Sequence, residues 1–326
     1  MKAAMRDRYG GPEVVEVRDV ERPTPTADQV LVRAHAASVN RADLDGLGPR
    51  WQFIRLFLGL RRPRNHSIGL DVAGVVEAVG PAATRFKPGD RVFADLFVFG
   101  VGAFAEYACA PERAFAPMPS GVSFEEAATL PHSAILALQG LRLRNGRTVG
   151  PGDRLLVVGA SGNVGPFAVQ IGKARGAHVT GVCRTEKIDF VRTLGVDEVI
   201  DYTKIDYTTT GERYDWILDV DARHSVLRSR HVLRPNGTYV SLGGPLSMLL
   251  DGLLLGPLVG KATGRRMGLL TSWKPFKAED VATLEELIAA GKLKPVIDRR
   301  YPLSEVVDAL RWVDEGRARG KVVITI

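Results

Sequence analysis

Residues 155–165 read Leu-Leu-Val-Val-Gly-Ala-Ser-Gly-Asn-Val-Gly, and this stretch decides the fold. Its first four residues form a short apolar run of the kind found in buried parallel strands. Three glycines with regular spacing then open a helical pattern: Gly159, Gly162 and Gly165. A second apolar run, residues 178–182, follows at the spacing of a strand–helix–strand unit. Together these features predict a dinucleotide-binding turn, in which backbone N–H groups approach a pyrophosphate at a helix N-terminus.

The residues after the second strand distinguish the two nicotinamide nucleotides. An NAD site usually carries Asp or Glu about 20 residues after the glycines, where it accepts hydrogen bonds from the ribose 2′-OH. This chain has Cys183-Arg184-Thr185-Glu186-Lys187 instead. The Arg184 guanidinium and the Lys187 ammonium both suit a 2′-phosphate. The sequence therefore predicts NADPH, and the alternative is a solvated basic loop that binds nothing.

Length and composition are those of a two-domain soluble enzyme. The 326 residues exceed the size of one compact core. No uninterrupted apolar stretch has the length of a membrane span, and no apolar leader follows Met1, so we expect no integral membrane segment and a cytoplasmic location. The two cysteines, Cys109 and Cys183, cannot build a disulfide framework or a zinc ribbon.

The net charge of +7 raises the question of nucleic acid or an anionic membrane as a partner. The cationic clusters are dispersed, however, and none has the interleaved aromatic residues of a base-stacking surface. We therefore expect no nucleic-acid partner. General surface charge that attracts an anionic cofactor explains the excess.

Secondary-structure patterns divide the chain into three parts. Strand-like runs separated by Pro, Gly and Asp turns occur first, at 14–17, 29–34, 72–79 and 91–93. A helix start at Ser123 and a helical pattern interrupted by Pro131 follow. Six strands then alternate with helices, at 155–159, 178–182, 197–200, 215–220, 237–242 and 266–271. The last part has helices at 278–290 and 304–315 and strands at 296–299 and 322–326. These patterns predict a doubly wound α/β domain, residues 127–273, inserted into a domain built from residues 1–126 and 274–326.

Motifs along nearly the whole chain resemble the medium-chain dehydrogenase/reductase superfamily, in its zinc-independent, quinone oxidoreductase-like and enone reductase-like branch. The matching segments are 38–43, 69–74, 87–92, 129–131, 159–165, 199–202 and 318–322. The resemblance implies a Rossmann doubly wound parallel sheet inserted into a GroES-like β-barrel catalytic domain, a small-molecule substrate and a homodimer. The residues it assigns to cofactor binding are Ser161, Gly162, Asn163, Val164, Arg184, Thr185, Lys187, Tyr202, Val220, Leu242, Gly243, Gly244 and Lys321.

Zinc is not expected. The zinc-using relatives have a cysteine where this chain has Asn40 and a His-Glu pair where it has Leu70-Asp71. Without a Lewis acid, oxidation of simple alcohols is disfavoured, whereas hydride transfer to a conjugated acceptor leaves a delocalised enolate. The sequence thus predicts an NADPH-dependent reductase acting on a quinone or on the activated C=C bond of an α,β-unsaturated carbonyl compound. An NADP-dependent alcohol dehydrogenase is a weaker alternative.

Three residues are catalytic candidates: Asn40, Asp43 and His132. The resemblance implies that the Asn40 amide lies near the nicotinamide and holds the substrate carbonyl or the cofactor ring, although a turn-capping role is the alternative. Asp43 is expected to orient the neighbouring backbone rather than to transfer a proton. His132 could donate a proton or be a helix histidine with its hydrogen bonds satisfied. Asp45-Gly46 stands where many relatives have a tyrosine, so solvent is the other proton source.

Further features leave alternatives open. Asn163 replaces the usual middle glycine and tolerates unusual φ values. Apolar stretches at 51–58 and 248–255 could line the substrate pocket or pack in the core, or contact a membrane surface together with Arg61, Arg62, Arg265 and Arg266. The strand 266–271 would form an exposed sheet edge, which pairing in a homodimer would cover. The nicotinamide is expected between the two domains, near Asn40 and residues 242–244. A cofactor-binding scaffold, such as a sensor or RNA-binding protein with little turnover, is the competing hypothesis.

Overall fold

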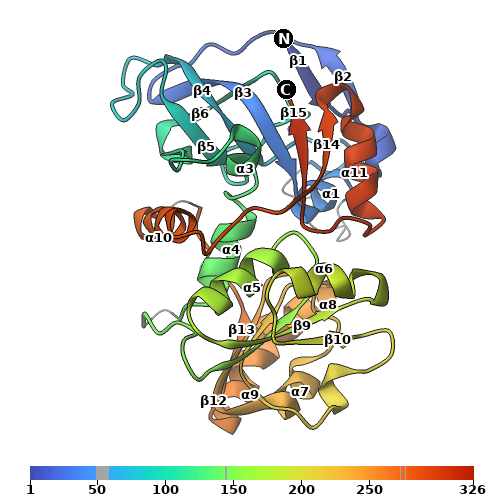
Figure 1. Ribbon diagram of the computed structural model, residues 1–326. Helices are drawn as coiled ribbons and strands as arrows, with labels where there is room; N and C mark the ends of the chain where they lie inside the picture. The colour runs from blue at the N-terminus through green and yellow to red at the C-terminus, as the bar shows by residue number, and fades with distance from the viewer. Residues whose placement is uncertain (49–58, 144, 272, 276) are drawn as a thin grey trace. The chain divides into compact units, whose positions relative to one another are not determined.

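The computed structural model describes residues 1–48, 59–143, 145–271, 273–275 and 277–326 (Figure 1). The predicted apolar stretch 51–58 lies outside these residues. The chain forms two compact units, the first of Met1–Ile135, Pro275–Glu285 and Pro295–Ile326, and the second of Leu136–Lys274 and Glu286–Lys294. The second unit is thus inserted into the first. Residues 127–135, which the sequence analysis gave to the inserted domain, belong to the first unit, and Glu286–Lys294 belongs to the second.

The second unit contains a six-stranded sheet in the order β10-β9-β8-β11-β12-β13, and all neighbouring strands are parallel. This is the strand order of a complete doubly wound sheet, with the reversal of direction between β8 and β11. The strands are β8 (Arg154–Val158), β9 (His178–Cys183), β10 (Glu198–Asp201), β11 (Tyr214–Asp219), β12 (Leu233–Ser241) and β13 (Arg266–Leu269). All six predicted strands are present. β12 begins earlier than predicted, because the strand includes its Pro-Asn-Gly segment. Its pairing with β11 has a register irregularity at this place.

Helices accompany this sheet, among them α4 (Ser133–Gly140), α5 (Gly165–Ala174), α6 (Ile188–Thr193), α7 (Val226–Ser229), α8 (Leu246–Leu250) and α9 (Gly256–Thr263). Helix α5 starts directly at the glycine turn and has Pro166 in its first turn, a position where the missing N–H costs nothing. It buries Phe167, Val169 and Ile171. The 3-10 turn η4 (Thr185–Lys187) follows β9, and a π-helical turn (Asp251–Leu255) joins α8 to α9.

The first unit contains a seven-stranded sheet in the order β14-β15-β3-β4-β5-β7, with β6 paired to β3. The strands are β3 (Gln29–Val39), β4 (Asp71–Val79), β5 (Arg91–Asp95), β6 (Tyr107–Pro111), β7 (Phe115–Pro117), β14 (Ile297–Pro302) and β15 (Lys321–Thr325). A separate pair is formed by β1 (Lys2–Met5) and β2 (Glu16–Asp19). The predicted strand 14–17 is wrong in part, because Pro12–Val14 forms a 3-10 turn before β2 begins.

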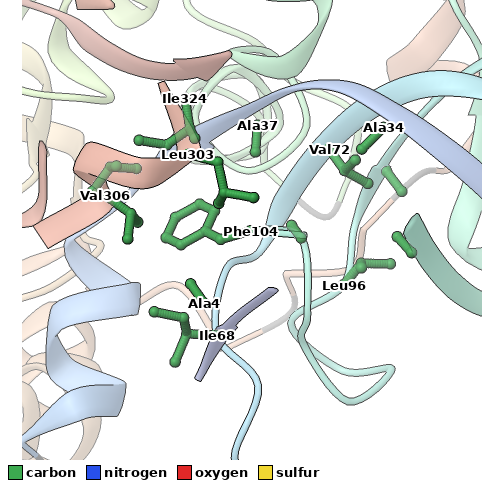
Figure 2. Close-up of a cluster of buried hydrophobic side chains, with 14 of the residues drawn as sticks. Ala4, Ala34, Ala37, Ile68, Val72, Leu96, Phe104, Leu303, Val306 and Ile324 are labelled. Atoms are coloured by element: carbon green, nitrogen blue, oxygen red, sulfur yellow. The ribbon is translucent and has the colours of Figure 1, made fainter. Parts of the chain in front are cut away.

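Apolar side chains from distant parts of the chain fill the core of the first unit. Phe104 is fully buried and lies among Leu303, Val306 and Ile324 (Figure 2). Leu303 precedes, and Val306 opens, the predicted C-terminal helix, which is observed as α11 (Val306–Asp314). Helix α10 (Ala278–Ala289) was also predicted.

The segment before the second unit positions several polar residues. Ser123 caps helix α3 (Phe124–Ala128), since its side chain accepts a hydrogen bond from the Glu126 N–H at 3.2 Å. Pro131 then separates α3 from α4, as the sequence predicts. His132 and Ser133 therefore stand at the start of α4, within the first unit.

Candidate functional site

The glycine turn at the start of α5 has the geometry of a phosphate-binding turn. Gly159 has a φ of +84°, which L side chains rarely adopt. A Cβ on Gly165 would lie 2.3 Å from the Gly159 carbonyl oxygen, so only glycine allows the helix to start this close to the turn. At Gly162 a Cβ would meet nothing nearer than 3.5 Å, so its face is open to an approaching group. These are the three separate roles of the glycines in a dinucleotide-binding turn.

Asn163 lies between Gly162 and Gly165 and does not have a positive φ. Among the described residues, the only non-glycine positions with positive φ are Ala27, Val101 and Asn236. The tolerance of unusual φ expected from Asn163 is therefore not needed. Ser161 and Val164 of the same turn are buried, at 7% and 6% exposure.

The other predicted cofactor residues of the second unit gather at the same edge of its sheet. Val220 directly follows β11, and a Cβ on Gly159 would lie 3.4 Å from the Val220 Cβ. Leu242 and Gly243 follow β12, where the Leu242 N–H donates to the Asp219 carbonyl at 2.9 Å and the Gly243 carbonyl accepts from the Ala222 N–H at 3.0 Å. Gly244 has a φ of +136°. The carboxyl ends of β8, β11 and β12 thus meet at the point where the strand order reverses, which is where such sheets bind nucleotides.

Arg184 and Tyr202 lie together beyond β9 and β10. The Tyr202 N–H donates to the Cys183 carbonyl at 3.0 Å, and hydrogen bonds with Tyr202 and Glu186 raise the pKa of Arg184. The Arg184 guanidinium pairs with Glu186 at 3.2 Å and remains 37% exposed. The Thr185 hydroxyl donates to the Asp201 carboxylate at 2.5 Å, which fixes this loop to the end of β10.

The cations of this loop differ from the prediction in one respect. Lys187 is buried, at 6% exposure, and is not the open point charge that the sequence suggested. Arg223, which the sequence analysis missed, lies with its guanidinium carbon 5.8 Å from the centre of the Tyr202 ring. The sequence could have indicated Arg223, because this residue comes soon after β11 and so lies at the same edge of the sheet.

A fully buried polar cluster occupies the first unit, made of Asn40, Asp71, Ser133 and Lys321. The Lys321 ammonium donates to Asn40 Oδ1 at 2.5 Å, to Ser133 Oγ at 3.2 Å and to Asp71 Oδ2 at 3.4 Å. The Asn40 amide donates to Asp71 Oδ2 at 2.8 Å, and its Oδ1 also accepts from Ser133 at 3.1 Å. Burial lowers the pKa of Lys321, and the Asp71 carboxylate acts against it. The cluster is an internal ion pair bridged by an amide and a hydroxyl.

Lys321 and Asn40 have surroundings in this cluster that differ from those expected. Lys321, assigned by resemblance to the nucleotide, has no exposed surface, and its ammonium bonds three side chains of the first unit. Asn40 is 1% exposed, and its amide has partners at both its oxygen and its nitrogen. The structure therefore makes both residues parts of one buried network. Their contact with a cofactor or substrate stays a prediction.

Asp43 makes the backbone contact that the sequence predicts for it. It is the third residue of helix α1 (Arg41–Leu47), and its Oδ2 accepts from the Asn40 N–H at 2.7 Å. Among the described residues, its Oδ1 has no hydrogen-bond partner. Burial raises the pKa of Asp43 to about 7, although the hydrogen bond from Asn40 lowers it.

His132 forms a pair with a carboxylate that the sequence analysis missed. Its Nδ1 lies 2.7 Å from Asp95 Oδ2, and its backbone N–H donates to Asp71 Oδ1 at 3.0 Å. The imidazole is 12% exposed, while the Asp95 side chain has no exposed surface. Burial lowers the pKa of His132, but the carboxylates of Asp95 and Asp71 outweigh it and leave the pKa raised. The pair favours the imidazolium form, which is an acid able to donate a proton.

The signal for Asp71 and Asp95 is present in the sequence. Each is a single carboxylate within an apolar run, Leu70-Asp71-Val72 and Ala94-Asp95-Leu96. A buried carboxylate requires a partner. Sequence alone does not show that the partners are Lys321 and His132, which are distant along the chain.

Comparisons with known proteins agree with this architecture. Residues 26–120 match the family model of the alcohol dehydrogenase GroES-like domain, and residues 194–324 match that of a zinc-binding dehydrogenase. The chain is similar to the mitochondrial NAD(P)H oxidoreductase RTN4IP1 of Mus musculus, with 33% identity over 100% of this chain and 89% of the relative. It is also similar to the chloroplast envelope quinone oxidoreductase homolog of Arabidopsis thaliana, with 34% identity over 99% of this chain and 98% of the relative. Among solved structures, the quinone oxidoreductase from Coxiella burnetii has a TM-score of 0.87 and 28% identity, covering 100% of this chain and 99% of that one.

The residues present do not fit the zinc that the second family model implies. Among the described residues, no group of three or more His, Cys, Asp and Glu side chains could hold a metal ion. Asn40 and Asp71, which stand at the ligand positions of the zinc-using relatives, instead bond the Lys321 ammonium. A positively charged donor at that place repels a metal cation. The glycine turn, in contrast, fits a nicotinamide nucleotide.

Proposed function

Because this chain belongs to the medium-chain dehydrogenase/reductase superfamily, in its quinone oxidoreductase-like branch, we propose that it is an NADPH-dependent quinone or enone reductase. It is an oxidoreductase with a nicotinamide cofactor and a small-molecule substrate. The observation that carries the proposal is the glycine turn beside Arg184 and Tyr202, at one edge of the doubly wound sheet.

The charges beyond β9 support NADPH rather than NADH as the cofactor. Arg184 and Arg223 both lie against Tyr202, so two guanidinium groups can meet a 2′-phosphate. Glu186 is the acid next to Arg184, and it is 59% exposed and paired with that cation. A carboxylate held in this way is a poor acceptor for a ribose 2′-OH. When bound, the reduced nicotinamide supplies the hydride.

The acceptor is a conjugated carbonyl compound. Zinc independence is supported by the Lys321 ammonium, which bonds Asn40 and Asp71 where the zinc-using relatives have metal ligands. Without a metal to lower the pKa of an alcohol, the favourable reaction is hydride addition to the β-carbon of an enone or to a quinone, where the negative charge is delocalised. Purified protein should therefore keep its activity in the presence of a chelator.

A proton must follow the hydride. The His132–Asp95 pair is the side-chain candidate, because the Asp95 carboxylate holds the imidazole by a 2.7 Å contact and favours its protonated form. Solvent is the alternative donor. The role proposed for Asn40 is electrostatic positioning through its network.

A homodimer and a cytoplasmic location complete the proposal. β13 is the last strand of the six-stranded sheet, so its outer edge is available to pair with a second copy. The relatives named above include a mitochondrial and a chloroplast protein, so location is a property of each protein and not of the family.

A substrate panel tests the function. Oxidation of NADPH and NADH is measured with quinones, enones, saturated ketones and secondary alcohols with NADP. We expect turnover of a quinone or an enone with NADPH, and no comparable activity on secondary alcohols. Efficient alcohol oxidation, with every quinone and enone ignored, would contradict the proposal. Nucleotide binding without any turnover would favour the scaffold hypothesis.

A further inference from the structure

The helical run Leu246–Thr263, made of α8, the π-helical turn and α9, is apolar but mostly exposed. Its mean hydropathy is 1.3 over 18 residues, and only 17% of that window is buried. By length and composition it is long enough to cross a membrane, which contradicts the expectation that no segment has this property. We call this run the α8–α9 segment.

One face of the α8–α9 segment is fixed against the sheet, which argues against a membrane span. Gly252, Gly256 and Gly260 recur every four residues and are buried. A Cβ on Gly256 would lie 2.9 Å from the Met267 carbonyl oxygen, and one on Gly260 would lie 2.8 Å from the Arg265 carbonyl oxygen. The glycine face therefore packs directly on β13 and on Arg265, the residue that precedes this strand. A segment held against its own sheet in this way cannot also be surrounded by lipid.

The opposite face carries leucines. Leu254 and Leu258 are 60% and 65% exposed, and each stands two residues, or roughly half a helical turn, after a buried glycine. Leu250, Leu253 and Leu255 are 44%, 45% and 44% exposed. These five side chains form the leucine face. Leu253 stands at its margin, where it lines a hollow with Leu269 and Leu270.

Positive charge lies at the C-terminal end of the leucine face. Lys261 and Arg266 are exposed, and no carboxylate among the described residues lies within ion-pair distance of either. The one acid between residues 246 and 266 is Asp251, which accepts a hydrogen bond from the Val226 N–H at 2.5 Å. The surface thus combines exposed leucines with unpaired cations and has no outward acid.

Pairing between two copies at the β13 edge is expected to leave Leu254 and Leu258 uncovered. Such pairing extends the sheet sideways, whereas Leu254 and Leu258 point away from the sheet, opposite the glycines. An anionic bilayer offers both partners that this surface lacks, acyl chains for the leucines and phosphate groups for Lys261 and Arg266.

We propose that the α8–α9 segment is a peripheral anchor that lies in the surface of an anionic membrane, with its leucine face among the acyl chains. The segment is parallel to the bilayer surface and does not cross it. This inference does not depend on the cofactor or on the reaction proposed above. It does place the enzyme where lipid-soluble conjugated acceptors are concentrated.

Vesicle flotation of the full chain tests the anchor. The wild type is mixed with vesicles of phosphatidylcholine alone, or of equal parts of phosphatidylcholine and phosphatidylglycerol. We expect it to float with the anionic vesicles and far less with the neutral ones. The double variant L254D/L258D should bind roughly ten-fold or more weakly, because two carboxylates replace the inserted side chains.

Two further variants control for folding and for charge. Ile205 is 52% exposed and lies after β10, outside the leucine face. Ile205→Asp should therefore float like the wild type. K261E/R266E keeps the leucines and should abolish the preference for anionic vesicles. Melting temperatures and light-scattering masses are measured for every variant.

Three results would overturn the proposal. The wild type could fail to float with anionic vesicles, or L254D/L258D could float as well as the wild type. The double variant could also change from dimer to monomer while its flotation stays unchanged, which would make the leucine face a contact between copies.

Discussion

Lys321 is the residue whose surroundings differ most from those that sequence reasoning assigned to it. A lysine with no exposed surface loses its hydration, and the Asp71 carboxylate and the Asn40 and Ser133 oxygens replace the lost water. Removing one partner of a buried ion pair leaves the other charge uncompensated, which is costly.

The first prediction concerns this ion pair. Lys321→Met should lower the free energy of unfolding by about 3–5 kcal/mol, because the Asp71 carboxylate stays buried without its cation. Lys2→Met is the matched control, since Lys2 forms an ion pair with Asp19 at 3.2 Å but both side chains are exposed. That variant should change the free energy by less than about 1 kcal/mol. Urea unfolding measures both changes. If the two variants lose equal free energy of unfolding, the buried pair is not stabilising.

The second prediction concerns pH and Asp219, the last residue of β11. Burial raises the pKa of Asp219 to about 7, although a 3.0 Å hydrogen bond from Tyr239 lowers it. The ordinary pKa is about 3.9. Between these values the folded state binds more protons than the unfolded state. The contribution of Asp219 to the free energy of unfolding therefore falls as the pH rises from about 4 to 7.

Asp219→Asn removes this titration. The stability of the variant relative to the wild type should therefore rise across that window, by at most about 1.4 kcal/mol per pH unit. Tyr239→Phe removes the hydrogen bond and should move the window to higher pH. Urea unfolding at a series of pH values measures both effects. A difference between Asp219→Asn and the wild type that does not change with pH would refute the raised pKa.

The third prediction concerns Arg184. Arg184→Ala should weaken NADPH binding by roughly ten-fold or more, since a charge-assisted hydrogen bond contributes about 1.5–3 kcal/mol. NADH binding should change little, because NADH has no 2′-phosphate. Arg192→Ala is the control, as Arg192 lies on the neighbouring helix α6 and pairs with Asp189 at 3.1 Å. Dissociation constants by calorimetry decide the matter, and equal weakening of both nucleotides would exclude Arg184 as the discriminating residue.

At the scale of the elements, apolar runs located β8, β9 and β11, because both faces of these inner strands are buried. The less buried edge strands β10 and β13 were predicted from the alternation of strands and helices. The short strands β1, β6 and β7 of the first unit were missed, since partly exposed strands of three to five residues carry little periodic signal. The α8–α9 segment was predicted only as an apolar stretch. Its glycines and proline are poor helix formers, so the sequence does not indicate a helix, although the glycines pack against the sheet.

The fourth prediction belongs to the edge strand β13. Two copies pairing at this edge should give a particle with twice the chain mass of 35.4 kDa in light scattering. Leu270, which follows β13 and is partly buried in the single chain, should be covered further by the second copy. Leu270→Asp should then shift the protein towards the monomer. A wild type that is monomeric at micromolar concentration would refute the dimer.

At the scale of the whole molecule, the sequence predicted the doubly wound sheet and its insertion into a β-rich unit, and the structure has both. The nucleotide-binding edge stays a prediction. The buried cluster of the first unit could not be predicted, since Asn40, Asp71, Ser133 and Lys321 are far apart along the chain. Their association depends on β15 pairing with β3, which in turn pairs with β4. The proposal of zinc independence first rested on missing ligands. The Lys321 ammonium, which bonds Asn40 and Asp71, adds a physical argument for it.

Transfer of deuterium from labelled NADPH tests the central claim most directly. The enzyme is incubated with NADPH that carries deuterium at the transferred position of the nicotinamide and with an enone from the substrate panel. The account predicts a saturated carbonyl product with deuterium on its β-carbon, as seen by NMR and mass spectrometry. Deuterium on the carbonyl carbon of an alcohol product, or labelled NADPH that stays unoxidised with every enone and quinone, would contradict it.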